Sequence, residues 1–154
     1  MAVPCPAMHV SSHIFPALPY TTWHGDRQNY SLYLKNNIFL ADINNERAVK
    51  NATYKTHMTA LNTYALLYST TDMIVVPRSS PWFQFYAEGQ DTRVVAWNES
   101  ESYRGGWLGL RTLAETGRLL RWQVNCSHSD IPRLACKPQS YDAVVRDLLN
   151  NTLP

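Results

Sequence analysis

The sequence has 154 residues, the length of a single domain, and 45% of them are hydrophobic while 17% are charged. These proportions are typical of a globular protein and exclude a disordered chain. A net charge of +2 without a basic run is too small to indicate nucleic-acid binding. No stretch of about 18 residues is apolar enough for a transmembrane helix.

Residues 1–30 are rich in proline and have no periodicity, so we expect an irregular segment there and a folded unit over residues 31–154. His9 and His13 are spaced i, i+4, which could suit a metal on a helix. The neighbouring prolines and the lack of a carboxylate make a chance pair the better interpretation. We expect neither a metal nor a cofactor.

The sequence contains more Asn-X-Ser/Thr sites for glycosylation than the about two expected by chance. Proline interrupts the apolar residues at the N-terminus, which therefore does not resemble a signal peptide. We interpret the combination as a secretory-pathway protein whose natural N-terminus lies outside this sequence. The five sites are Asn29, Asn51, Asn98, Asn125 and Asn150.

Three cysteines leave the redox compartment open. In an oxidising compartment Cys126 would form a disulfide with Cys136, and Cys5 would be free or bonded to a cysteine outside this sequence. In a reducing compartment all three would be thiols. A zinc site formed by both late cysteines and His128 is the alternative, but its spacing is unusual and no fourth ligand is obvious.

The predicted elements of the first half of the sequence are followed by a single carboxylate, Asp72. Residues 31–47 contain an apolar cluster between asparagines, without a clear period, which predicts short irregular elements and a local core. A helix over residues 51–63, capped by Asn51, is followed by a strand over residues 64–68 and then by Asp72.

The second half continues the alternation of helices and strands. We predict a short helix over residues 81–87 capped by Ser80, a strand over 92–97, a polar loop over 99–106 and a helix over 108–116. A strand over 118–124 and a helix over 140–150, capped by Ser140, follow. This order predicts an α/β fold with a mostly parallel sheet and helices on both faces.

Two titratable residues follow predicted strands, at the end of a sheet where α/β proteins bind ligands. Asp72 follows the first strand and His128 the last. In a Ser-Asp-His triad the acid orients the imidazole, which takes the proton of the nucleophile. Taken alone, Asp72 is more simply a turn cap and His128 a surface histidine. None of the six glycines brackets a serine in the Gly-x-Ser-x-Gly pattern of the nucleophile.

Several stretches from about Tyr33 onward resemble the palmitoyl-protein thioesterase family of α/β-hydrolases, of which the chain would cover the C-terminal half. They are residues 37–47 (NIFLADINNER), 51–61 (NATYKTHMTAL), 72–86 (DMIVVPRSSPWFQFY), 108–113 (LGLRTL) and the Cys-Ser-His turn at 126–128.

The resemblance implies a lysosomal, glycosylated and disulfide-bonded hydrolase that removes long-chain fatty acyl groups, such as palmitoyl, from S-acylated proteins or acyl-coenzyme A. Asp72 and His128 would be the acid and base of the triad, and the serine would lie in a missing N-terminal half. The acyl groove would involve Ile38, Phe39, Leu40, Trp82 and Phe83. The alternative is a catalytically inactive truncated product or a non-catalytic acyl-binding protein.

Overall fold

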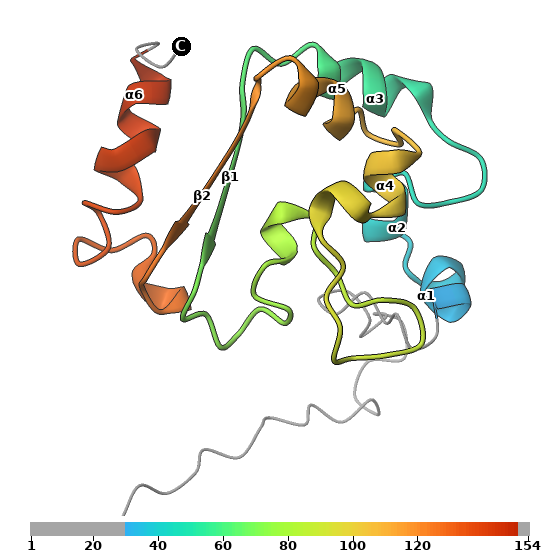
Figure 1. Cartoon of the computed structure of the whole chain (residues 1–154), viewed down its shortest axis with the longest axis horizontal. Coiled ribbons are helices and arrows are strands. Elements are labelled where there is room, and N and C mark those ends of the chain that lie inside the picture. Colours follow the sequence, from blue (N-terminus) through green and yellow to red (C-terminus); the bar gives the residue numbers. More distant parts are fainter. Residues whose placement is uncertain (1–29, 151–154) are drawn as a thin grey trace, which may run out of the picture.

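The computed structural model describes residues 30–150, and its centre is a small parallel sheet (Figure 1). Strand β1 (Tyr64–Ser69) pairs with strand β2 (Leu119–Val124), with Tyr64 opposite Leu119 and Ser69 opposite Val124. Both predicted strands are therefore confirmed, and because they are parallel their carboxyl ends lie at the same edge. The expectations for the proline-rich segment, Cys5, His9, His13 and Asn29 lie outside the described residues.

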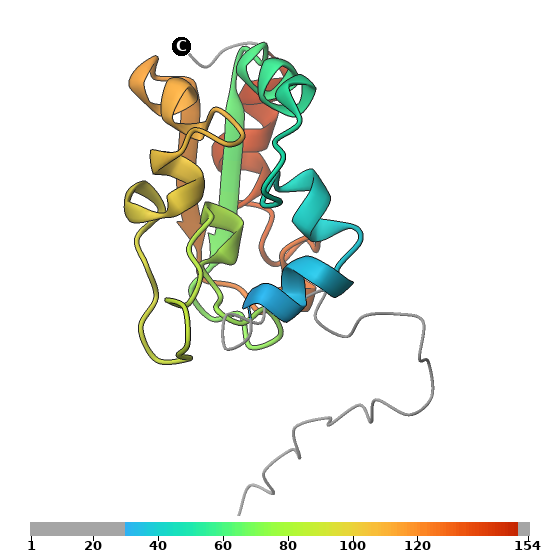
Figure 2. The same ribbon diagram turned by 90° about the vertical axis from the view of Figure 1, so that its right-hand side faces the viewer.

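Helices cover both faces of this sheet, which confirms the α/β class. Helix α6 (Arg146–Leu149), preceded by a π-helical turn at Tyr141–Val145, lies on one side. The other side carries α1 (Tyr30–Asn36), α2 (Leu40–Ile43), α3 (Ala52–Thr59), α4 (Glu101–Arg104) and α5 (Leu110–Glu115). The perpendicular view in Figure 2 shows the same separation.

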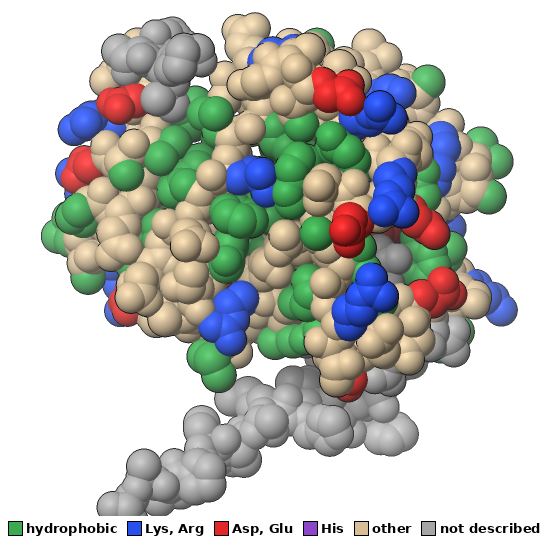
Figure 3. All heavy atoms as spheres, in the orientation of Figure 1, with side chains coloured by type: hydrophobic (Ala, Val, Ile, Leu, Met, Phe, Trp, Pro, Cys, Tyr) green, Lys and Arg blue, Asp and Glu red, His purple; other side chains and the backbone are tan. Residues whose placement is uncertain are grey.

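Helix α6 covers its face of the sheet only in part. A groove of about 650 Å³ lies between the sheet, where Leu67 and Trp122 line it, and the terminal helix, where Val145 and Leu148 line it. Hydrophobic side chains also reach the surface in the middle of the face shown in Figure 3. Two strands thus leave apolar surface exposed that a wider sheet with more helices would cover.

The predicted helices at residues 51–63 and 108–116 are confirmed as α3 and α5. Helix α3 begins after Asn51, whose side-chain oxygen accepts a hydrogen bond of 3.0 Å from the Thr53 N–H. Helix α5 begins after Gly109, which has φ +79° and lies so close to Thr59 of α3 that a side chain there would collide with it. Leu110 and Leu113 of α5 are fully buried.

The expectations for residues 81–106 are wrong in three places. The helix predicted over 81–87 is one 3-10 turn (Ser80–Trp82), because Phe83 adopts a left-handed conformation with φ 59° and ends it. The strand predicted over 92–97 reduces to one antiparallel bridge between Val94 and Tyr86. The predicted polar loop contains α4, which begins because the Ser100 hydroxyl accepts a hydrogen bond from the Tyr103 N–H.

Aromatic packing explains where the 3-10 turn sits. The Trp82 ring meets Tyr68 of β1 edge to face at a centroid distance of 4.6 Å, and its N–H donates to the Leu66 carbonyl. On its other side, the Arg121 guanidinium lies between the rings of Trp82 and Trp97. These contacts require an extended path after Trp82, which a continuous helix would not provide.

Ser140 does not cap the terminal helix as predicted. Its hydroxyl instead donates to the carbonyls of Cys136 and Ile131, at 3.1 and 3.2 Å, and the residue is buried. The helix consequently starts with a π-helical turn.

The local apolar core expected at residues 31–47 is only partly present: Tyr33 and Ala41 are buried, at 3% and 0% exposure, but two asparagines are buried beside them. Ile38 and Phe39 are 76% and 62% exposed, whereas Asn37 and Asn45 are 0% and 4% exposed. The Asn37 side-chain oxygen accepts hydrogen bonds from the Phe39 and Leu40 N–H groups at 3.1 and 2.6 Å, which starts α2. Residues 31–47 are thus held by polar contacts.

Asn45 joins three segments of chain. Its side-chain NH₂ donates to the carbonyls of Asn51 and Trp107, at 3.0 and 2.7 Å. Its side-chain oxygen accepts from the Asn51 N–H at 2.7 Å. The residue also has φ 56°, a conformation that asparagine tolerates better than most side chains. It therefore links the segment after α2 to the starts of α3 and α5.

We predict that Asn45→Ala lowers the free energy of unfolding by about 2–4 kcal/mol, because it leaves buried polar groups unpaired and strains the backbone. Chemical denaturation measures the change. Asn62→Ala, at an exposed turn, is the control and should change it by less than about 0.5 kcal/mol. Equal effects of the two substitutions would contradict the role of Asn45.

Candidate active site

Asp72 and His128 meet at the carboxyl ends of the two strands. The Asp72 Oδ2 atom lies 2.7 Å from the His128 Nδ1 atom, although the residues are 56 positions apart. The Asp72 side chain is 6% exposed and the imidazole is 46% exposed. The parallel register brings the ends of β1 and β2 together and so places an inward carboxylate beside an accessible imidazole.

The two oxygens of Asp72 have different partners. Oδ1 accepts hydrogen bonds from the N–H groups of Ile74 and Val75, at 2.8 and 3.0 Å, and so caps its own turn. Oδ2 faces His128. The turn-cap and the imidazole-orienting interpretations of Asp72 therefore both hold, each through one oxygen.

The balance of interactions keeps Asp72 ionised. Burial by itself raises the pKa of Asp72, but the hydrogen bonds from Val75, His128 and Ile74 outweigh it, and the pKa lies below its ordinary value of 3.8. A carboxylate can only accept hydrogen bonds, so Nδ1 of His128 carries the proton. In the neutral ring the lone pair of Nε2 is then free to accept a proton from another group.

Hydroxyl groups between β1 and Asp72 join the two strand ends. The Ser69 hydroxyl donates to the Cys126 carbonyl, and the Thr71 hydroxyl donates to the same carbonyl at 2.9 Å. The Thr70 N–H donates to the Val124 carbonyl at 2.9 Å. Ser69 ends β1, and Thr70 and Thr71 follow it, so three consecutive hydroxyl residues at the end of a strand are the signal in the sequence for such bonds.

A disulfide holds the turn that carries His128. Cys126 and Cys136 are bonded, with Cα atoms 5.9 Å apart, as expected for an oxidising compartment. Their sulfur atoms are therefore not available as thiolate ligands for zinc. The Asn125 N–H adds a hydrogen bond of 2.9 Å to the Gln139 side chain across the same loop. His128 is thus fixed from both sides of its turn.

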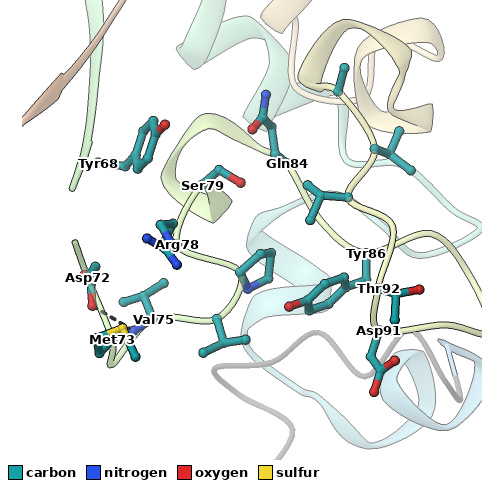
Figure 4. A pocket seen from close by; sticks show the side chains of 15 residues that line it. Tyr68, Asp72, Met73, Val75, Arg78, Ser79, Gln84, Tyr86, Asp91 and Thr92 are labelled. Carbon is teal, nitrogen blue, oxygen red and sulfur yellow. Dashed lines mark hydrogen bonds between the residues drawn. The ribbon is translucent and has the colours of Figure 1, made fainter. Parts of the chain in front are cut away.

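A cavity of about 590 Å³ opens beside Asp72 (Figure 4). Its wall is partly apolar, with Val75 and Val95, and partly polar, with Arg78 and Gln84. Arg78 and Gln84 were not among the predicted site residues, since only the turn at residues 77–83 brings them to this side of Asp72.

The geometry can be compared with known proteins. A family model described as palmitoyl protein thioesterase matches residues 8–128. This chain belongs to the palmitoyl-protein thioesterase family. The match includes Asp72 and His128 and begins earlier than about Tyr33, where the resemblance in the sequence became recognisable.

Individual members of the family are also similar. Palmitoyl-protein thioesterase 3 of Dictyostelium discoideum is 48% identical over 114 residues, which are 73% of this chain and 39% of that protein. Palmitoyl-protein thioesterase 1 of Caenorhabditis elegans is 40% identical over 111 residues, 72% of this chain and 37% of that protein. The lysosomal thioesterase PPT2 homolog of Drosophila melanogaster is 33% identical over 96 residues, 62% of this chain and 33% of that protein. The chain spans about two fifths or less of their lengths.

None of the five residues predicted to form the acyl groove lines the cavity beside Asp72. Trp82 and Phe83 are half-buried against β1, where Phe83 lies 6.5 Å from the Tyr64 ring centre. Ile38 and Phe39 point to solvent before α2, and Leu40 is half-buried. The acyl groove stays a prediction.

Two further observations concern the glycosylation sites and membrane-spanning helices. All four glycosylation sites within the described residues are exposed, namely Asn51, Asn98, Asn125 and Asn150. No helix between residues 30 and 150 has the length and apolar character needed to span a membrane.

We predict that ionised Asp72 stabilises the fold and that Asp72→Asn removes this contribution while keeping the shape. The folded-state pKa is lowered, so the stabilisation is complete well above 3.8 and is lost as the pH falls through the folded-state value. The difference in unfolding free energy between wild type and variant, measured by denaturation at several pH values, should therefore shrink in acid.

Glu88→Gln, at an exposed carboxylate, is the control and should change stability by less than about 0.5 kcal/mol. A difference between wild type and Asp72→Asn that grows toward acid pH would contradict the prediction.

Proposed function

We propose that this protein serves in the hydrolysis of thioesters of long-chain fatty acids, with Asp72 and His128 as the acid and base of a Ser-Asp-His triad. The observation that carries the proposal is the 2.7 Å contact of these residues at the strand ends, in a chain of the palmitoyl-protein thioesterase family. The names of the relatives support palmitoylated proteins as substrates. Acyl-coenzyme A is a second source of the same thioester bond.

The proposed reaction has two stages. The Nε2 atom of His128 takes the proton of a serine hydroxyl, whose oxygen attacks the thioester carbonyl carbon. The carbon–sulfur bond breaks, the leaving thiolate receives the proton from Nε2, and an acyl-serine remains. Nε2 then takes a proton from water, whose oxygen attacks the carbonyl carbon of the acyl-serine. The bond from this carbon to the serine oxygen breaks, Nε2 gives its proton to the serine oxygen, and the fatty acid is released. Asp72 stabilises the imidazolium in both stages.

The proposal places the nucleophile outside these 154 residues, because no Gly-x-Ser-x-Gly occurs within them. A serine on a neighbouring strand of a wider sheet would approach Nε2 from the exposed side of the imidazole. The exposure of the His128 side chain, 46%, supports this arrangement.

The groove proposed for the acyl chain uses the apolar residues that the fold leaves exposed. Each methylene that moves from water into an apolar groove contributes about 0.8 kcal/mol, so long chains are preferred without recognition of the protein that carries them. Ile38 and Phe39 are exposed and held by the Asn37 cap, which supports their availability for such a contact.

A lysosomal location is part of the proposal. The relatives named lysosomal thioesterase PPT2 in mouse and rat are each 33% identical over 100 residues of this chain. The Cys126–Cys136 disulfide supports passage through an oxidising compartment. The exposed sequons support glycosylation there.

The second candidate function is non-catalytic binding of acyl chains by an inactive, truncated product. It is favoured by one observation: the acid and base occur without the serine motif in the 154 residues.

The decisive experiment transfers the site into a complete relative. In a chimera, the aligned segment of the Dictyostelium palmitoyl-protein thioesterase 3 is replaced by that of this chain. We expect turnover of a palmitoyl thioester close to that of the parent. His128→Ala and Asp72→Asn should each lower kcat by about 10³-fold or more, because the imidazole is lost or misoriented.

His57→Ala provides the matched control, since His57 is exposed in α3, and it should leave kcat unchanged. An active chimera that tolerates His128→Ala would refute the proposed role of the pair.

An assay of the 154-residue chain by itself tests whether the nucleophile is absent from it. We expect no measurable hydrolysis of palmitoyl-coenzyme A by the purified chain, because the nucleophile is absent from it. Release of free thiol is the measurement. Turnover that His128→Ala abolishes would show that a serine within the chain can act, and would overturn this expectation.

A further inference from the structure

Two hydroxyl groups at the end of β1 hold one peptide group beyond the end of β2. The hydroxyls of Ser69 and Thr71 both donate to the carbonyl of Cys126, which lies two residues before His128. A carbonyl oxygen has two lone pairs, so both of them are used here. The Thr71 N–H also donates to the Ser69 side-chain oxygen at 3.2 Å. The segment before Asp72 is thereby tied to the segment before His128.

The acceptor belongs to the peptide group that leads to His128. Because a peptide group is planar, a fixed Cys126 carbonyl also fixes the Cα atom of Ser127, the residue directly before His128. The side chain of His128 is 46% exposed, so packing holds it only in part. The position of the imidazole therefore depends on the backbone of its turn.

The two donors lie equally close to Asp72. Thr71 is the residue directly before it, and the Asp72 N–H donates to the Ser69 carbonyl at 3.4 Å. Ser69 is 1% exposed, and a buried hydroxyl is costly unless it forms hydrogen bonds. Its partners, the Cys126 carbonyl and Thr71, belong to the two turns that carry the titratable pair.

We propose that Ser69 and Thr71 are positioning residues that set the contact between Asp72 and His128. This inference rests on the proposed function, in which that contact orients the imidazole. The disulfide ties Cys126 to a residue later in the same loop, whereas the hydroxyls tie it to the segment before Asp72. A displacement of about 1 Å between reacting groups can lower a rate about 10²-fold, so this tie bears directly on the proposed reaction.

The experiment is a double-mutant cycle on the full 154-residue chain and needs no turnover. Chemical denaturation gives the unfolding constants of the wild type, Asp72→Asn, His128→Ala and the variant with both changes. Their ratios give a coupling factor between the two side chains, which we expect to be about tenfold. Thr71→Val in all four proteins should reduce this factor to about threefold, because one donor remains, and the further change Ser69→Ala should reduce it to about one.

A role in stability alone would lower the unfolding constants together and leave the coupling factor as it is. Thr71→Ser keeps the hydroxyl and should keep the factor. Thr70→Val is the matched control. The Thr70 hydroxyl donates at 3.2 Å to the Val124 carbonyl, which also accepts the Thr70 N–H and lies four residues before His128. This substitution should leave the factor unchanged.

The proposal is overturned if the wild type shows no coupling, if Thr71→Val leaves the factor unchanged, or if Thr71→Ser or Thr70→Val lowers it as much as Thr71→Val does. Thr71 is exposed, so Thr71→Val decides the question even where a variant with Ser69→Ala does not fold.

The chimera with the Dictyostelium relative extends the test to turnover. Ser69→Ala with Thr71→Val should lower kcat about tenfold or more and leave KM unchanged, because both hydroxyls bind Cys126 rather than the substrate. An unchanged kcat would also overturn the proposal. Failure of the triad looks different: the chimera is then active after His128→Ala, whatever the coupling factor of the 154-residue chain.

Discussion

The parallel pairing of β1 with β2 is the constraint on which the rest of the structure depends. The register sets Ser69 opposite Val124, and from there each chain needs only a few residues to reach Asp72 or His128. The hydroxyls of Ser69 and Thr71 then bond to the Cys126 carbonyl, while the disulfide closes the loop on the other side. A one-residue slip of β1 would move the whole turn relative to His128 and separate the two side chains.

The two strands, helices α3 and α5 and the pair of titratable residues could be predicted from the sequence, because each is marked by a local signal. The apolar runs around Leu66 and Leu120 mark the strands, and Asn51 marks the start of α3. The proximity of Asp72 and His128 followed from the rule that parallel strands end at a common edge. Their contact distance and the two separate roles of the Asp72 oxygens could not be derived in this way, since they depend on the turn after β1.

Other parts were not predictable because tertiary contacts decided them. An apolar cluster at residues 38–43 normally indicates a core, but within it Ala41 is buried while Ile38, Phe39 and Ile43 are exposed. Buried beside it are Asn37 and Asn45, whose amides can satisfy several backbone atoms at once. The residues after Ser80 have an acceptable helix pattern. The packing of Trp82 against Tyr68 and Arg121 outweighs that weak local preference.

The site and the fold share the same charged group. Asp72 holds the turn after β1 through one oxygen and the imidazole through the other, so its ionised form stabilises both arrangements. The hydrogen bonds that keep the pKa of this buried carboxyl low come mostly from the backbone of its own turn. A carboxylate held in this way would stay negative beside a protonated imidazole, which is what the proposed triad requires. The negative charge of Asp72 therefore serves the imidazole.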